Sequence, residues 1–451
     1  MPNRLTALVS SCALALAATG CGSDDAAPGG SSAVEISYMA WYNVPSEINT
    51  TQGTLDAFNG SQGNVRASLI SADRKVYEAT LDARSDSNTL PDTAMMVESQ
   101  VVSWALAGKL ADVADLYQTE KPLPQLAFTY QGRTVAYSEA NEVIIIIYSR
   151  KAFDDAKLPY PPAKAENAWT WDEFVSVAKK LTKDQNGLTP NDTGFDAGHI
   201  VSYGADFNRR SWIWPVLAVS NGGGVVSEDG KTLLLGTPET AQAMQVIADL
   251  QHVHHVTESY TDWTNDMQNL DQMLLTGKFA MVVSGQWELG VTLNKAVMDH
   301  PNFYGVGVLP KMKTAVTYNT GGTNVMFNTT KKPDAAKQFI KWYSLEENNL
   351  ANIQSGLWMP ILHKWYTDES LIRQWADNPQ HPPLDEYRSA VIDYALNNAK
   401  QVPWYYTPGY EQIDGIMANE MEQVWDGTKS AAQALRDDIV PQVQPIFDAN
   451  H

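Results

Sequence analysis

A run of six apolar residues, Val143 to Tyr148, constrains most strongly what this chain can fold into. Its length suits a β-strand, and four of the six residues are isoleucine, whose branched side chain favours extended backbone. Because no position in the run is polar, other elements are expected to cover both faces of the strand. This pattern is typical of a sheet packed between layers of helices and predicts an α/β fold.

Strand-like and helix-like segments alternate along the rest of the chain. Residues 34–41 alternate apolar and polar side chains, which predicts a strand, and residues 55–58 belong to a helix that follows it. Two helix starts are explicit, because Thr170 to Glu173 forms a capping box and Thr237 precedes Pro238 at a first helical position. Strands that alternate with helices imply parallel βαβ units. Further strands are expected at 65–70, 91–97 and 277–285, and further helices at 102–110 and 333–342.

Residues 1–20 have the pattern of a secretory signal peptide. A positively charged residue precedes an apolar run from Leu5 to Ala18, which is too short to span a bilayer. The run ends in Ala-Thr-Gly-Cys21, which is similar to a bacterial lipobox with Ala in place of the commoner Leu. We expect cleavage before Cys21, lipidation of Cys21 and a flexible tether over residues 21–33, which are rich in Gly, Ser, Asp and Ala. An ordinary signal peptide that is cut elsewhere is the alternative.

Cysteine usage agrees with this interpretation. Cys12 lies in the predicted signal and Cys21 would carry lipid, and these are the two cysteines of the chain. The mature chain would therefore have no disulfide and no cysteine-based metal site. A secreted chain of this length without cross-links needs a large hydrophobic core, which suggests two domains or one large two-lobed domain.

Net charge narrows the classes of partner. The formal net charge of −20 argues against binding to nucleic acid or to an anionic membrane surface, and weakly against a strongly anionic ligand. The chain also contains fourteen tryptophans. Indole rings suit sugar recognition, because a sugar ring presents an apolar face and polar edges.

Three local motifs carry no chemistry on their own. His252 and His255 have the spacing of one helical face, but no third and fourth metal ligand accompanies them. Residues 222–224 are glycines without the Lys that a phosphate-binding loop needs, and Ser284 lacks the Gly-x-Ser-x-Gly context of a nucleophile. We therefore expect no metal, no cofactor and no catalytic residue.

Several segments together resemble the extracellular solute-binding proteins of the carbohydrate-uptake type, the maltose-binding-protein-like group that serves ABC importers. Each motif is weak alone, but they occur in the family's order over most of the chain. The segments are Tyr130 to Tyr148, Thr170-Trp-Asp-Glu-Phe174, Gly277-Lys-Phe-Ala-Met-Val-Val-Ser-Gly-Gln-Trp287, Tyr318 to Phe327 with its paired glycines, Lys332 to Phe339, and Gln354 to Pro360.

The resemblance implies a two-lobed periplasmic-binding-protein-like fold of type II, with a ligand cleft between the lobes. Each lobe would be a mostly parallel sheet flanked by helices. Carried over to this chain, residues 34–145 and 316–362 form the N-terminal lobe, and residues 146–315 and 363–451 form the C-terminal lobe. The implied protein is a monomer that is not an enzyme. It would be anchored through Cys21 to the outer face of the cell membrane and deliver a carbohydrate to ABC permease subunits.

Candidate ligand-binding residues follow strands, because ligands of α/β proteins bind at the carboxyl ends of parallel strands. The first strand ends at Trp41, Tyr42 and Asn43. The resemblance adds Glu142 as a carboxylate on the first crossover, and Trp287 as the ring that covers a sugar face. It also indicates Glu98, Ser99, Gln100, Trp212, Trp214, Gly322, Trp358, Trp404, Tyr405 and Tyr410. Some of these aromatic residues are expected in the core, and at most one of Trp212 and Trp214 is expected to contact ligand.

Two other interpretations stay open. The first is a binding protein for a polyol, a glycerol-phosphate-type compound or a peptide, although an anionic ligand should demand Arg or Lys and the candidate segments contain none. The second is a secreted glycosidase, which needs two carboxylates across a glycosidic bond, and nothing local marks such a pair.

Overall fold

The computed structural model describes residues 33–42, 45–266 and 269–450. The predicted signal peptide, Cys21, most of the tether and Asn43 lie outside these residues. Within the described ranges, no helix combines the length and the apolar composition that crossing a membrane requires.

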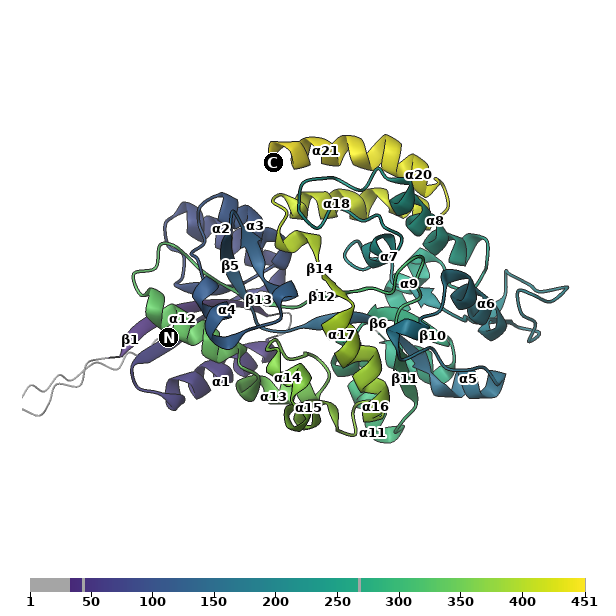
Figure 1. Ribbon diagram of the computed structural model, residues 1–451, viewed down its shortest axis with the longest axis horizontal. Helices are drawn as coiled ribbons and strands as arrows, with labels where there is room; N and C mark the ends of the chain where they lie inside the picture. The colour runs from purple at the N-terminus through teal and green to yellow at the C-terminus, as the bar shows by residue number, and fades with distance from the viewer. Residues whose placement is uncertain (1–32, 43–44, 267–268, 451) are drawn as a thin grey trace, which may run out of the picture.

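Two six-stranded sheets organise the molecule, and they lie side by side in Figure 1. The first has the order β2-β1-β3-β13-β5-β4, and the second has the order β14-β12-β6-β10-β9 with β11 paired to β6. The strands of the first sheet are β1 Val34–Tyr42, β2 Val65–Asp73, β3 Thr93–Met96, β4 Phe128–Tyr130, β5 Arg133–Ser138 and β13 Thr323–Met326. Those of the second are β6 Glu142–Ser149, β9 Asp206–Phe207, β10 Met281–Gly285, β11 Tyr304–Gly307, β12 Thr317–Thr320 and β14 Ala399–Gln401, and β7 Lys183–Asp184 pairs with β8 Ile200–Ser202 separately.

Helices cover the two sheets and identify an α/β fold, as predicted. Around the first sheet lie α1 Ser46–Ser61, α2 Arg74–Asp86, α3 Glu98–Leu106, α4 Ala114–Glu120, α12 Pro333–Ser344, α13 Glu346–Gln354, α14 Lys364–Thr367 and α15 Glu369–Ala376. Around the second lie α5 Arg150–Ala156, α6 Trp171–Leu181, α7 Pro215–Ser220, α8 Pro238–His252, α9 Tyr260–Asp266, α10 Leu270–Thr276, α11 Asn294–Asp299, α16 Leu384–Tyr387 and α17 Asp393–Asn397. The C-terminal helices are α18 Tyr410–Glu420, α19 Glu422–Trp425, α20 Ala431–Gln433 and α21 Val440–Ala449. Figure 1 shows α18 and α21 running across the top of the molecule, and α18 packs against α3.

The local predictions hold where the physical signal is strong. Strand β6 is buried from Val143 to Ser149, as its apolar run requires. The capping box at α6 is complete, because the Thr170 hydroxyl accepts from the Glu173 backbone N–H at 3.3 Å and Glu173 accepts from the Thr170 N–H at 2.8 Å. Thr237 likewise caps α8 by accepting from the Thr240 backbone N–H.

Strand pairing is more mixed than the mostly parallel sheets expected. In the first sheet β1 is parallel to β2 and β3, but β13 is antiparallel to both β3 and β5. In the second sheet β6 is antiparallel to β10, β11 and β12. The antiparallel strands β6, β12 and β13 adjoin the points at which the chain passes from one sheet to the other.

The chain changes sheets three times: between β5 and β6, between β12 and β13, and between β13 and β14. The predicted lobe boundary after residue 145 falls inside β6. Strand β12, which the predicted boundary before residue 316 assigns to the N-terminal lobe, pairs with strands of the second sheet. A Cβ on Gly321 would lie 2.2 Å from the Ala140 carbonyl oxygen, and one on Gly322 would lie 2.2 Å from a carboxylate oxygen of Glu139. The first two crossing segments, residues 139–141 and 321–322, therefore lie so close together that only glycine fits, which explains the paired glycines of the sequence.

Candidate ligand-binding site

A cavity of about 600 Å³ lies where the two crossing segments meet the facing edges of both lobes. Four groups of residues line it. The first-lobe wall is Trp41, Arg74, Met96, Val97, Glu98 and Ser99; the second-lobe wall is Trp212, Trp287 and Val291; the pocket floor is Glu142, Thr320, Gly321 and Gly322; and the third side is Leu357, Trp404, Tyr410 and Asp414.

The first-lobe wall starts with Trp41, near the end of β1. Its ring packs edge-on against Tyr77 of α2 at 5.2 Å between centroids. The guanidinium of Arg74, the first residue of α2, lies 5.2 Å from the centre of the Trp41 ring and forms an ion pair with Glu78 at 2.9 Å. Arg74 therefore stacks on the indole while its charge is balanced one helical turn away.

Glu98 fixes several segments around the pocket. Its carboxylate accepts hydrogen bonds from the Thr320 hydroxyl at 2.9 Å and the Gly321 N–H at 2.9 Å. It also accepts from the Trp404 indole N–H at 2.8 Å and the Tyr405 hydroxyl at 3.0 Å. Burial raises the pKa of Glu98 to about 7, although these four donors act against the rise. With both oxygens occupied, Glu98 joins the start of α3 to the crossing segment and to the later loop.

The second-lobe wall is a tryptophan pair. Gly285 ends β10, and a Cβ at this position would lie 1.9 Å from the ring of Trp287, so the indole folds back flat on the glycine. The rings of Trp287 and Trp212 lie 5.4 Å apart at 41°. Both side chains are partly exposed, and Arg210 lies 5.5 Å from the Trp212 ring. The wall therefore offers apolar ring surface to the cavity.

Glu142 lies on the pocket floor at the start of β6. Burial and the neighbouring carboxylates of Glu98, Glu139 and Glu288 raise its pKa to about 8. Among the described residues, none donates a hydrogen bond to this carboxylate. Glu142 thus differs from Glu98 in having no hydrogen-bond partner in the part of the chain that the structure describes.

The third side combines aromatic and acidic groups. The ring centroids of Trp404 and Tyr410 lie 5.5 Å apart, and Tyr410 and Asp414 occupy successive turns of α18. The Tyr410 hydroxyl and one carboxylate oxygen of Asp414 are buried without a hydrogen-bond partner. Burial raises the pKa of Asp414, and the Ser211 hydroxyl partly offsets the rise.

The structure brings nine of the predicted site residues together in this pocket: Trp41, Glu98, Ser99, Glu142, Trp212, Trp287, Gly322, Trp404 and Tyr410. Their contact with a ligand stays a prediction. Five others do not line it. Tyr42 is half-buried at the end of β1, and Gln100 donates to Glu78 at 3.2 Å. Trp358 packs partly against the core while its neighbour Leu357 faces the pocket.

The structure places Trp214 and Tyr405, two of the predicted ligand-binding residues, in the core. Trp214 precedes α7 and is fully buried in the core, because residues 211–214 form a turn that turns Trp212 outward and Trp214 inward. Tyr405 is also fully buried. Its ring stacks on that of Phe128 with 3.7 Å between the centroids, and its hydroxyl donates a hydrogen bond to Glu98. Tyr405 thus supports a wall of the pocket without lining it.

Sequence reasoning missed eight lining residues: Arg74, Met96, Val97, Val291, Thr320, Gly321, Leu357 and Asp414. Arg74 could have been found, because it follows β2 directly and the carboxyl ends of strands mark the site. It also corrects the expectation that the site contains no Arg or Lys. Asp414 had no local signal, since only the packing of α18 against α3 carries it to the pocket.

His252, one of the two histidines with helical spacing, contacts the backbone of another helix. A ring nitrogen of His252 lies 2.9 Å from the Trp425 carbonyl oxygen, so the ring joins the end of α8 to α19. Over the described part of the chain, no three His, Cys, Asp or Glu side chains gather closely enough to hold a metal ion.

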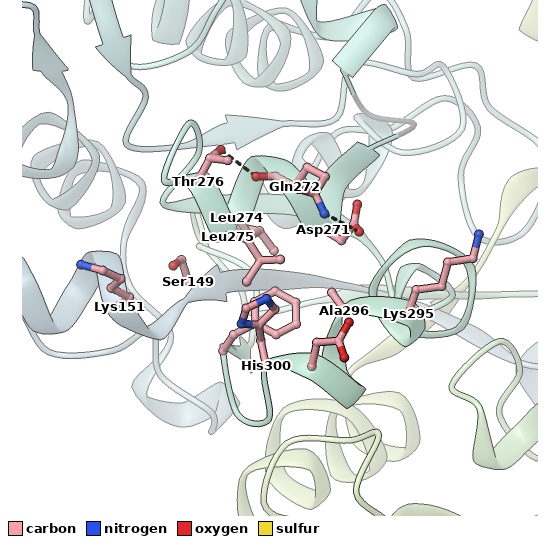
Figure 2. Close-up of a pocket in the computed structure, with 12 residues that line it drawn as sticks. Ser149, Lys151, Asp271, Gln272, Leu274, Leu275, Thr276, Lys295, Ala296 and His300 are labelled. Carbon is pink, nitrogen blue, oxygen red and sulfur yellow. Dashed lines mark hydrogen bonds between the residues drawn. The ribbon is translucent and has the colours of Figure 1, made fainter.

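A second cavity of about 640 Å³ lies wholly in the second lobe, between the end of β6, α10 and α11 (Figure 2). Its charged side chains are of both signs, with Lys151, Lys295, Asp271 and Asp299 around an apolar centre. It contains no tryptophan and none of the predicted site residues. The inter-lobe pocket is therefore the stronger candidate, since small-molecule sites favour interfaces between lobes and aromatic linings.

Two lobes that share an inter-lobe pocket define a two-lobed binding protein. The profile of the family "bacterial extracellular solute-binding protein" matches residues 54–383, well over half of the chain. The chain belongs to this family, which confirms the predicted membership.

Sequence relatives and solved structures agree on this class. The maltotriose-binding protein of Pyrococcus abyssi is 22% identical over 346 residues, which cover 74% of this chain and 68% of that protein. An ABC substrate-binding protein of Listeria monocytogenes, solved in complex with cycloalternan, has a TM-score of 0.71 at 19% identity and covers 92% of this chain and 99% of its own. The cyclic alpha-maltosyl-1,6-maltose binding protein of Arthrobacter globiformis has a TM-score of 0.71 at 21% identity, with 92% and 100% covered. These structures share the fold with this chain.

Proposed function

We propose that this protein binds a sugar or oligosaccharide in the inter-lobe pocket and delivers it to an ABC importer. The carrying observation is that four indoles, Trp41, Trp212, Trp287 and Trp404, line a single cavity beside carboxylates. An indole that covers the apolar face of a sugar removes surface from water, which is worth about 25 cal/mol per Å². Micromolar affinity corresponds to about −8 kcal/mol, which a few stacked rings and hydrogen bonds supply after the entropic cost of binding.

Polar groups in the pocket support the same ligand class. The Tyr410 hydroxyl and the carboxylates of Glu142 and Asp414 have free hydrogen-bonding capacity. Sugar hydroxyls meet such groups well, and a site of this kind rejects ligands that leave its polar atoms unpaired. Relatives that bind maltotriose and cyclic saccharides support a saccharide for this chain as well.

The placement at the membrane rests on the sequence of the first 33 residues. An acylated Cys21 would hold the protein at the outer face of the cell membrane, and residues 22–33 would leave the folded part free to turn. The protein then acts as a monomer that meets its permease subunits at the membrane. Mass spectrometry of the protein from the membrane fraction tests this, because a diacylglyceryl group on Cys21 is expected and an unmodified new N-terminus elsewhere would contradict it.

Thermal unfolding of residues 33–451 against a panel of mono- and oligosaccharides tests the ligand class. A saccharide at one hundred times its dissociation constant should stabilise the protein by about 2.7 kcal/mol. The panel includes polyols, glycerol phosphate and short peptides. A shift with one of these and none with any saccharide would remove carbohydrate from the proposal, and release of shorter products from an oligosaccharide would indicate a glycosidase.

A further inference from the structure

We propose that the pocket selects a saccharide that carries a positively charged amino group, and that Glu142 and Asp414 receive this group. The inference rests on the proposed function and narrows its ligand class. It starts from a difference among the acidic side chains in and beside the pocket: Glu98 and Glu139 accept hydrogen bonds from the protein, whereas Glu142 accepts none from the described residues.

Glu98 and Glu139 have protein donors. Glu98 accepts four hydrogen bonds, and Glu139 accepts one from the Asn324 side-chain amide at 2.8 Å. Glu142 is on the pocket floor, and within the described ranges no group donates to it. This partly exposed carboxylate is open to a ligand that supplies N–H donors there.

The charges that act on Glu142 all have the same sign. They belong to Glu98, Glu139 and Glu288. Arg74 is the one cation among the residues that line the pocket, and it is engaged by Glu78 and by the Trp41 ring. A ligand cation would therefore be the first positive charge close to Glu142. It would favour release of the proton that the raised pKa of Glu142, about 8, keeps on this carboxyl at neutral pH, because opposite charges attract strongly where water is partly excluded.

Asp414 provides a second acceptor from a different element. One of its carboxylate oxygens is buried without a donor, and so is the hydroxyl oxygen of Tyr410 one turn earlier on α18. These two groups and Glu142 come from segments far apart in the chain and line one cavity. An ammonium group, with three N–H donors, matches several free acceptors better than one hydroxyl does.

The indole rings of the pocket also favour binding of a cation. Indoles attract cations over their faces, and the protein already places its own Arg74 and Arg210 over Trp41 and Trp212. The pocket thus combines unpaired carboxylates with cation-accepting rings. A neutral sugar uses the rings, whereas an amino sugar uses both.

Titration calorimetry with matched sugars tests the proposal. The probes are glucosamine, N-acetylglucosamine and glucose, the corresponding galactose series, and the β-1,4-linked trimers of the first three. Within at least one series we expect the amine to bind at least about tenfold tighter than both neutral counterparts, the strength of one charge-assisted contact. Glu142→Gln should reduce this ratio to about threefold or less.

Two further variants keep the result interpretable. Glu228→Gln removes one exposed carboxylate, paired with Lys400 outside the pocket, and should keep the wild-type preference, which controls for net charge. Asp414→Asn should reduce the preference as Glu142→Gln does. Retention of the full preference in both pocket variants would overturn the assignment.

The outcomes separate the two proposals. Neutral sugars that bind as tightly as their amines to the wild-type protein would overturn this inference and leave saccharide binding intact. Absence of binding by any saccharide, charged or neutral, would overturn the proposed function and this inference together.

Discussion

The two walls of the pocket are built by different means. The first-lobe wall is held by hydrogen bonds, because Glu98 accepts four donors from the crossing segment and the later loop. The second-lobe wall is held by ring packing, because Trp287 lies flat on Gly285 and against Trp212. We therefore expect the first wall to contribute mainly to the stability of the fold, because it fixes the architecture around the site. We expect the second wall to contribute mainly to ligand affinity, because it presents ring surface that a ligand can cover.

The largest effect is expected from breaking the first-lobe wall. Glu98→Ala leaves the buried indole N–H of Trp404 and the Tyr405 hydroxyl without their acceptor, and it should lower the free energy of unfolding by about 3 to 5 kcal/mol. Urea denaturation measures this. Gln100→Ala, two residues along α3, is the control and should cost about 0.5 kcal/mol or less. A loss below about 1 kcal/mol in Glu98→Ala would mean that this wall does not depend on the carboxylate.

Removing a ring from the second-lobe wall should affect affinity more than stability. Trp287→Ala should weaken saccharide binding by about 2 to 3 kcal/mol, roughly 30- to 150-fold, because the ring is partly exposed without ligand and covered with it. Gly285→Ala should act in the same direction, since its Cβ would displace the ring. Calorimetry measures both.

Trp358→Ala is the control for this wall, because Trp358 does not line the pocket. It should change affinity less than about twofold. Equal losses in Trp287→Ala and Trp358→Ala would show that the second-lobe wall is not the sugar-covering surface.

The acidic side chains around the pocket should make stability fall as pH rises. Burial raises the pKa of Glu98 and Glu139 to about 7 and that of Glu142 to about 8, so the folded state keeps protons that the unfolded state has released. From pH 6.5 to 8 the free energy of unfolding should drop by on the order of 2 kcal/mol. Below pH 6.5 the neutral, buried His381, whose pKa is lowered to about 4, opposes this trend.

Chemical denaturation across this pH window measures the slope. Glu142→Gln should flatten it, because the amide does not titrate. Stability that stays constant or rises between pH 6.5 and 8 would contradict the raised pKa values.

The smallest effect is expected from Arg74, at the outer edge of the first-lobe wall. Its ion pair with Glu78 and its stacking on Trp41 are both partly exposed, and each contributes about 1 kcal/mol or less. Arg74→Met should therefore lower neutral-sugar affinity about threefold at most. A larger loss in calorimetry would place Arg74 in direct contact with the ligand.

Strong local signals in the sequence predicted much of the fold. The apolar run at Val143 to Tyr148 predicted a strand covered on both faces, and the capping box at Thr170 predicted the start of α6. The strand-end position of Trp41 and the Gly285-Gln286-Trp287 turn pointed to two facing sides of the pocket. The predictions of β6 and of the start of α6 are confirmed because they depend on side chains close together in the chain.

Features that depend on long-range packing could not be located from the sequence. No local pattern encodes the pairing of β6 and β12 with the second sheet, so the predicted lobe boundaries at residues 145 and 316 stay predictions. Trp212 and Trp214 are two residues apart and equally apolar, and only the turn before α7 sends one to the pocket and the other to the core.

The sequence by itself determined the α/β class, the helix starts and a set of residues able to bind a ligand, because periodicity, capping and turn chemistry act over a few residues. The tertiary structure decided which carboxylate is satisfied and which is free. Glu98 and Glu142 look alike in the sequence, yet the crossing segments and residues 404–405 bring four donors to the first and none to the second. Hydrogen-bond partners more than two hundred residues away make this difference, and only the folded chain brings them together.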